Sequence, residues 1–135
     1  MSDSTPGLDN RHADNPLARH GHVSYLEIPA VDVQRSARFY EAVFGWTTRG
    51  NEAGGISFDD PAGNLIGRWD ARLAVARNPG FMVYIYVVGM DDALERIPAA
   101  GGEVVQRPRR EGDLWVATSR DPAGNLIGLW QFDPR

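Results

Sequence analysis

The chain has 135 residues, no cysteine, a formal net charge of −4 and a pI near 5.3. This length suits a single domain. The acidic balance disfavours nucleic acid as a partner, and the absence of cysteine excludes disulfides and thiolate chemistry. No apolar run is long enough to span a membrane, and the amino terminus lacks the apolar core of a signal peptide. We therefore expect a cytoplasmic protein whose partner is a small molecule.

Residues 1–21 are predicted to form a disordered tail, because Ser, Asp, Asn, Pro and Gly dominate them. His12 and His20 lie in this tail, and His22 lies at its edge. A flexible tail lacks the fixed geometry that a metal site needs. His22 is therefore only a weak candidate metal ligand.

The octapeptide DPAGNLIG occurs twice, at residues 60–67 and 121–128, and a tryptophan follows each copy, Trp69 and Trp130. An identical internal match indicates a structural unit that is used twice. We place the two modules at residues 22–70 and 80–132, within a single domain of residues 22–132. The connecting segment ends in the turn dipeptide Pro79-Gly80.

The first module is predicted to begin with a strand at residues 23–29. Asp32 is a suitable N-cap for the helix that follows, and Gly45 is suited to end it. Short strands are expected at 46–49 and 55–59. A turn in which Gly63 takes a positive φ then leads into a last strand at 65–70.

The second module repeats this order. A strand is predicted at 81–88 and a helix at 91–100, in which Pro98 removes a backbone donor near the end. Strands are expected near 103–107, 114–120 and 125–132. Both modules are therefore β-α-β-β-β units, and the fold class is α+β, with a curved mixed sheet around a central cleft.

Alternation along the strands separates core positions from cleft positions. Leu26 and Ile28 are expected to face the helix, which leaves Tyr25 and Glu27 on the other side. The same reasoning places Trp69 and Trp130 in structural, helix-facing positions. The predicted ligand-binding residues are Tyr25, Met82, Tyr86, Trp115, Leu129 and Gln131. Tyr25, Tyr84 and Tyr86 are suited to stack on a planar ligand.

The segment EIPAVDVQRSARFYEAVFGW, residues 27–46, resembles the first-module signature of the vicinal oxygen chelate superfamily, the glyoxalase/bleomycin resistance protein/dioxygenase family. The two DPAGN-L-I-G hairpins are similar to the hairpins that close its modules. The resemblance implies two tandem modules around a cleft and a homodimer. The family includes metal-dependent isomerases, epimerases, lyases and extradiol dioxygenases, together with metal-free proteins that sequester antibiotics.

The resemblance also implies where a metal would be held, on the first and last strands of each module. These positions correspond to Tyr25, Asp70, Met82 or Tyr84, and Gln131. None is histidine, and only Asp70 is a good ligand for a divalent ion. We therefore expect no cofactor and no full metal site. Asp70, Gln131 and His22 are weak candidates for a divalent metal.

Glu27 and Arg68 would lie on strands that pair in this fold. The favoured interpretation is an ion pair that satisfies its own charges. In the catalytic alternative Glu27 is the general base, and Arg68 or Tyr84 stabilises an enolate-like anion. The two functional hypotheses are thus metal-free binding of a small organic molecule, and a glyoxalase-like lyase, isomerase or dioxygenase. The enzyme would abstract a proton next to a carbonyl, with a metal or with Glu27 alone.

Overall fold

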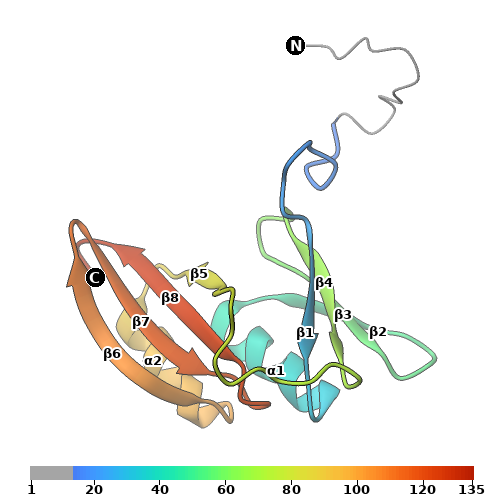
Figure 1. Ribbon diagram of the computed structural model, residues 1–135. Helices are drawn as coiled ribbons and strands as arrows, with labels where there is room; N and C mark the ends of the chain where they lie inside the picture. Colours follow the sequence, from blue (N-terminus) through green and yellow to red (C-terminus); the bar gives the residue numbers. More distant parts are fainter. Residues whose placement is uncertain (1–13) are drawn as a thin grey trace.

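The computed structural model describes residues 14–135, so most of the predicted tail, including His12, lies outside the described residues (Figure 1). The chain forms two consecutive β-α-β-β-β modules, which confirms the predicted α+β architecture. The elements of the first are β1 (Tyr25–Pro29), α1 (Val33–Phe44), β2 (Thr47–Gly50), β3 (Ile56–Asp59) and β4 (Ile66–Asp70). Those of the second are β5 (Tyr84–Tyr86), α2 (Met90–Ala99), β6 (Glu103–Glu111), β7 (Leu114–Arg120) and β8 (Leu126–Phe132).

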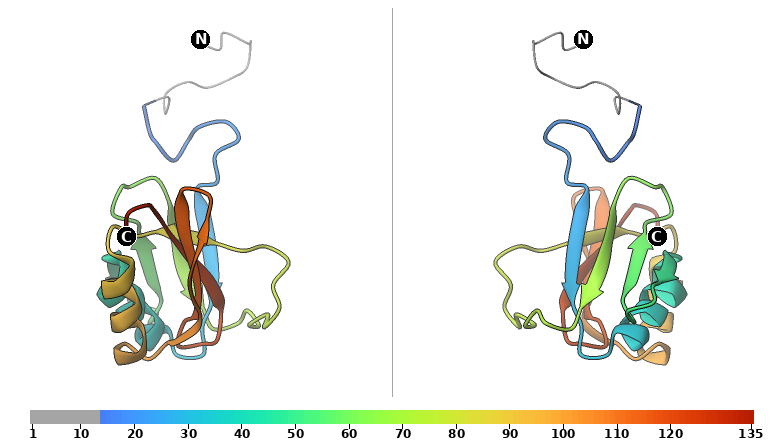
Figure 2. Two further views of the ribbon diagram at one scale, coloured as in Figure 1. Left: turned by 90° about the vertical axis from the view of Figure 1, so that its left-hand side faces the viewer. Right: turned by 90° about the vertical axis from the view of Figure 1, so that its right-hand side faces the viewer.

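Each module has its own four-stranded mixed sheet. The strand orders are β1-β4-β3-β2 and β5-β8-β7-β6, with β1 parallel to β4 and β5 parallel to β8. The two sheets are separate, with β1 and β2 as the edge strands of the first and β5 and β6 as those of the second. Figure 2 shows both helices on one side of the sheets and the connecting segment between β4 and β5 on the other. We call the face of each sheet that lies opposite its helix the outer face.

The predicted helix signals of the first module act as expected. The Asp32 side chain accepts a hydrogen bond from the Arg35 amide at 3.2 Å, and Gly45 ends α1 with a φ of 73°. In the second module α2 begins at Met90, one residue earlier than predicted, and contains Pro98. Strand β6 is longer than predicted and continues to Glu111. Neither helix is long and apolar enough to cross a membrane.

Aromatic packing dominates the core of the first module. Trp46 stacks between Tyr40 and Phe58, with ring centroids 4.6 and 4.5 Å away, and Trp69 packs on Phe58 at 4.9 Å. The core of the second module is mainly aliphatic, with Met90, Ile97 and Leu129 fully buried. The Trp69 position agrees with the sequence prediction.

The two octapeptides form different hairpins. In the first, Asp59 pairs with Ile66 and the loop spans residues 60–65. In the second, Arg120 pairs with Leu126 and the loop spans residues 121–125. A difference of one residue reverses which side chains face the helix.

This difference overturns the predicted orientation of three residues. Trp130 lies on the outer face, where its ring contacts Tyr86, with centroids 4.8 Å apart. Leu129 is fully buried, and Gln131 accepts a hydrogen bond from the Met90 amide at 2.9 Å, at the start of α2. The expectation that Leu129 and Gln131 face a cleft on the outer side was therefore wrong.

Candidate functional site

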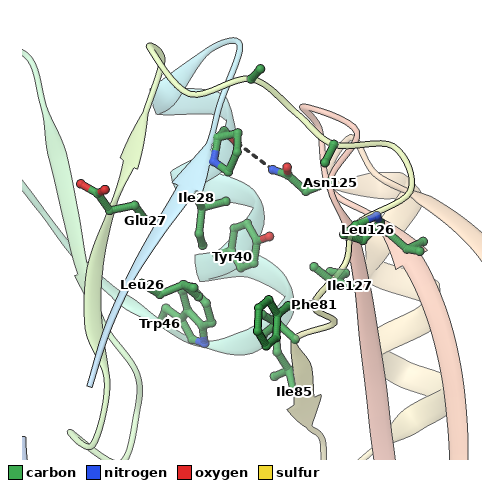
Figure 3. Close-up of a pocket in the computed structure, with 15 residues that line it drawn as sticks. Leu26, Glu27, Ile28, Tyr40, Trp46, Phe81, Ile85, Asn125, Leu126 and Ile127 are labelled. Atoms are coloured by element: carbon green, nitrogen blue, oxygen red, sulfur yellow. Dashed lines mark hydrogen bonds between the residues drawn. The ribbon is translucent and has the colours of Figure 1, made fainter. Parts of the chain in front are cut away.

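An apolar cavity of about 190 Å³ lies between the two modules (Figure 3). Its walls come from the edge strands β1 and β5, from α1, from the start of β8 and from the connecting segment. Tyr40 and Trp46 are also core residues of the first module. The lining residues are Leu26, Glu27, Ile28, Pro29, Tyr40, Trp46, Ala74, Ala76, Pro79, Phe81, Val83, Ile85, Asn125, Leu126 and Ile127.

The side chains that enter the cavity from the strands are those that face the helices. Leu26 and Ile28 from β1, and Ile85 from β5, pack against the core as well as lining the cavity. The carboxylate of Glu27 points away from the cavity in Figure 3, which leaves its backbone as the lining part. The wall is therefore largely hydrocarbon, without a charged side chain directed inward.

The polar side chains at the cavity hold the two modules together. The Tyr40 hydroxyl donates to Asp121 at 2.8 Å. The Asn125 side-chain amide donates to the same carboxylate at 2.8 Å and to the Pro29 carbonyl at 2.7 Å. Burial, and secondarily the Asp121 carboxylate, raise the pKa of Tyr40 well above its usual value. Tyr40 therefore stays a neutral donor, committed to Asp121.

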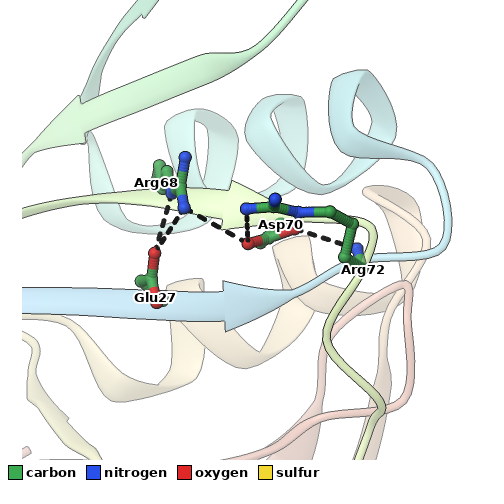
Figure 4. Close-up of polar contacts among 4 residues, drawn as sticks. All are labelled: Glu27, Arg68, Asp70 and Arg72. Carbon is green, nitrogen blue, oxygen red and sulfur yellow. Dashed lines mark hydrogen bonds and ion pairs between the residues drawn. The ribbon is translucent and has the colours of Figure 1, made fainter.

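Glu27 and Arg68 lie on the outer face of the first module, in register on β1 and β4 (Figure 4). The Arg68 guanidinium contacts the Glu27 carboxylate at 2.8 Å and Asp70 at 3.4 Å. Arg72 approaches both oxygens of Asp70 at 3.0 Å. Hydrogen bonds from the Arg72 side chain and backbone lower the pKa of Asp70 to about 2. The predicted ion pair forms, and it belongs to a larger network.

Aromatic side chains occupy the outer face of the second module. The Tyr84 ring lies over Gly128, and Tyr86 contacts both Trp130 and Phe132. Tyr84, Tyr86 and Phe132 are about half exposed, at 49%, 45% and 52%. This aromatic surface is separate from the cavity, because none of its four residues lines it.

Of the candidate residues named from the sequence, only Glu27 lines the cavity. Tyr25, Arg68, Tyr84 and Tyr86 lie on the outer faces and do not line this cavity, so their role in a cleft on that side stays a prediction. The half-buried Met82 precedes β5 and is likewise not among the lining residues.

Trp115 is also not at the cavity. Its indole donates to Asp133 at 2.8 Å, and its ring packs against the guanidinium groups of Arg110 and Arg135. The Trp115 ring is therefore already covered by Arg110 and Arg135. Trp115 pairs with Gln131 in the β7–β8 ladder, so it shares the helix-facing side with that residue.

The candidate metal ligands are bound to other groups. Asp70 is held by Arg72, Gln131 contacts the start of α2, and the His22 ring lies 2.7 Å from the Asn64 carbonyl. Among residues 14–135 there is no group of three or more His, Cys, Asp or Glu side chains that could hold an ion. The donors present do not fit the tetrahedral or octahedral sets that catalytic ions require.

Sequence reasoning missed Tyr40, Trp46 and Asn125 as cavity residues. Tyr40 lies within the helix predicted between Asp32 and Gly45, and Asn125 begins the strand predicted at 125–132, so neither was singled out. Their role depends on contacts between residues 81 to 96 positions apart. No local spacing in the sequence carries that information.

Comparison with known proteins supports the same fold. The anthracycline biosynthesis protein DnrV of Streptomyces peucetius is 29% identical over an alignment 135 positions long, which covers 82% of this chain and 47% of that protein. The chain thus spans about half the length of the curated relatives it matches.

Solved structures also resemble this fold. A glyoxalase-related enzyme from Fulvimarina pelagi superposes with a TM-score of 0.64 at 21% identity, covering 82% of this chain and 88% of that one. TnmS3, an antibiotic binding protein from Streptomyces sp. CB03234, gives a TM-score of 0.64 at 19% identity, covering 83% and 96%. Residues 21–129 match the sequence description of one family. The chain belongs to the Glyoxalase/Bleomycin resistance protein/Dioxygenase superfamily.

Proposed function

We propose that this protein binds a small, neutral organic molecule in the cavity between its modules, without a metal ion. The observation that carries the proposal is the apolar cavity itself. Its hydrocarbon walls would stabilise a ligand by removing apolar surface from water, at roughly 25 cal/mol per Å². The relatives named for anthracycline biosynthesis and antibiotic binding support an organic molecule as the class of ligand.

The cavity volume limits the size of the ligand. An engineered apolar cavity of about 150 Å³ accepts benzene, whereas pockets for drug-sized molecules begin at about 300 Å³. At about 190 Å³ this cavity fits a molecule of one ring. A larger ligand would require residues 71–80, which contribute Ala74, Ala76 and Pro79, to move outward.

A ligand screen by thermal unfolding tests the proposal, because a ligand that binds the native state raises the Tm. We expect benzene or indole to raise it in a concentration-dependent manner. Ala76→Trp would fill the mouth of the cavity and abolish the shift. Asn78→Trp is the matched control, since Asn78 is exposed in the same segment but does not line the cavity. Equal shifts in both variants would refute the cavity as the site.

The metal-free part of the proposal has its own test. We expect elemental analysis of the purified protein to find substoichiometric Zn, Ni, Mn and Fe, and the ligand-induced Tm shift to survive a chelator. One equivalent of any of these metals would contradict this part and favour the lyase, isomerase or dioxygenase alternative. Turnover of a carbonyl substrate that is lost in Glu27→Gln would favour the same alternative, with Glu27 as the base, whether or not a metal is bound. The 2.8 Å ion pair with Arg68, on the outer face, is the reason that Glu27 is the less favoured explanation.

We also propose a homodimer, supported by the open edges of β2 and β6 in the described part of the chain and by the exposed aromatic surface of the second module. Natural proteins cover such edges, and a large exposed apolar patch usually marks an interface. Size-exclusion chromatography with light scattering should give twice the monomer mass of 14.9 kDa. Phe132→Ser should shift the equilibrium toward monomer. A wild-type monomer at micromolar concentration would contradict this proposal and leave the cavity proposal intact.

A further inference from the structure

The free edge of β1 presents the backbone of one residue to the cavity. Ile66 donates its amide to the Ser24 carbonyl, and Ala30 donates to the Asp70 carbonyl. In a parallel ladder successive residues direct their backbone groups to alternate sides. Residues 24, 26, 28 and 30 therefore point toward β4, and residues 25, 27 and 29 toward the free edge. The amide and carbonyl of Glu27 both lie on that edge, in the stretch that lines the cavity.

Tyr40 and Asn125 also bring polar side chains to this largely apolar wall, but both are already hydrogen-bonded to Asp121, which leaves the two Glu27 groups free to pair with a ligand. Pro29, the next residue with the same orientation, has no amide hydrogen, and its carbonyl accepts from Asn125 at 2.7 Å. In the part of the chain that the structure describes, β1 has no strand partner other than β4. A donor and an acceptor that lie side by side on a strand edge without a strand partner can both pair with a ligand that carries the complementary groups, so they form a recognition element.

We propose that the ligand is a neutral single-ring molecule that carries an N–H donor and a carbonyl acceptor on adjacent atoms, as in a lactam. This inference rests on the proposed function and specifies its ligand. The lactam carbonyl would accept from the Glu27 amide while the lactam N–H donates to the Glu27 carbonyl. The ring would then lie among Ile28, Ile85 and Ile127, three of the lining residues.

The surroundings of the cavity favour a neutral ligand over an ion. The Glu27 carboxylate, the only charged side chain among the lining residues, points to the outer face and is paired with Arg68 at 2.8 Å. An ionised ligand would therefore lose its hydration without gaining a counter-charge. A neutral molecule with two matched hydrogen bonds loses little on leaving water.

The first test uses three probes of similar size on the wild-type protein. We expect 2-pyridone to bind about tenfold more tightly than N-methyl-2-pyridone, which keeps the acceptor but lacks the donor, and than benzene, which lacks both. In a two-dimensional amide NMR spectrum, the Glu27 amide proton should move downfield with 2-pyridone and stay unchanged with benzene.

A matched pair of variants gives the second test. Glu27→Pro removes the amide donor at an edge strand, where proline is tolerated, and it also breaks the ion pair. Arg68→Ala breaks the same ion pair without touching the Glu27 amide. We expect 2-pyridone affinity to fall about tenfold in Glu27→Pro and to stay unchanged in Arg68→Ala. If Glu27→Pro does not fold, the affinities for the three probes and the shift of the Glu27 amide proton in the wild type still test the proposed lactam ligand.

The outcomes separate this inference from the proposed function. Equal affinities for the three probes, without a change at the Glu27 amide, would overturn the lactam assignment and leave apolar binding in the cavity intact. Strong protection of the Glu27 amide from hydrogen exchange before any ligand is added would also overturn it, because the edge would already be paired. Binding of none of the probes would overturn both proposals.

Discussion

The two copies of DPAGNLIG have the same eight residues and different structures. In the first copy Asp60 accepts from the backbone amides of Asn64 and Leu65 and remains half-buried. In the second copy Asp121 is buried and accepts from three backbone amides, from Asn125 and from Tyr40 of the other module. The same sequence thus closes a hairpin in one module and joins the two modules in the other.

The glycines that end the two copies show the same divergence. Gly67 faces the core, where a Cβ atom would lie 1.9 Å from the Leu26 carbonyl and 2.5 Å from the Phe58 ring. Gly128 faces the outer side, where the three atoms nearest to a Cβ atom would all belong to the Tyr84 ring, the first at 2.3 Å. Local sequence therefore does not fix what a residue does. The length of the loop and the partner of the strand decide it.

Replacing Gly67 and Gly128 by alanine should give the largest difference in stability between the two copies. Gly67→Ala forces a shift of backbone in the core and should destabilise the protein by about 3 kcal/mol, the upper end for overpacking. Gly128→Ala must displace the half-exposed Tyr84 side chain but no backbone atom among its nearest neighbours, and should cost about 1 kcal/mol, at the lower end for overpacking. Urea unfolding of both variants measures the difference. Equal losses would contradict the opposite orientation of the two copies.

The two aspartates provide the next comparison. Asp121→Ala leaves the buried Tyr40 hydroxyl and several amides without an acceptor, and should cost about 2 to 3 kcal/mol. Asp60→Ala exposes its loop amides to water and should cost about 1 kcal/mol. Chemical unfolding, with Asp60→Ala as the matched control, tests whether the second copy alone joins the modules. A larger loss at Asp60 would show that it does not.

The link between Tyr40 and Asp121 should also give a pH dependence. The pKa of Tyr40 is raised in the folded protein, so its contribution is fully present below the unfolded value of about 10. As the pH rises above that value, the unfolded chain loses the proton first and stability falls. Tyr40→Phe should lower the free energy of unfolding by about 1 kcal/mol at neutral pH. Between pH 9 and 11 the free energy of unfolding of this variant should decrease less steeply than that of the wild type. Parallel slopes would contradict this assignment.

Much of the fold could be predicted because its signals are local. Asp32 and Gly45 mark the ends of α1, the repeat indicates two modules, and strand pairing brings Glu27 opposite Arg68. The first two of these features depend on residues that are close in sequence or related by the repeat, whereas the third was expected from the family resemblance.

The site was harder to predict because its determinants are not local. Alternation gives two faces for a strand, but the hairpin loop decides which of them meets the helix. Gln131 and Trp130 exchanged their predicted faces for that reason. The cavity depends on how the modules pack, through Tyr40, Asp121 and Asn125, and no pattern within either module encodes that contact.

The smallest effect is expected at the pair that the sequence marked most clearly. Glu27 and Arg68 are 39% and 44% exposed, and exposed ion pairs contribute about 0 to 1 kcal/mol. Arg68→Ala should therefore change the free energy of unfolding by less than about 1 kcal/mol and leave the affinity for benzene unchanged, since Arg68 does not line the cavity. Calorimetric titration and urea unfolding measure the two quantities. A large loss of affinity with unchanged stability would instead place the binding site on the outer face of the first module, beside Asp70 and Arg72.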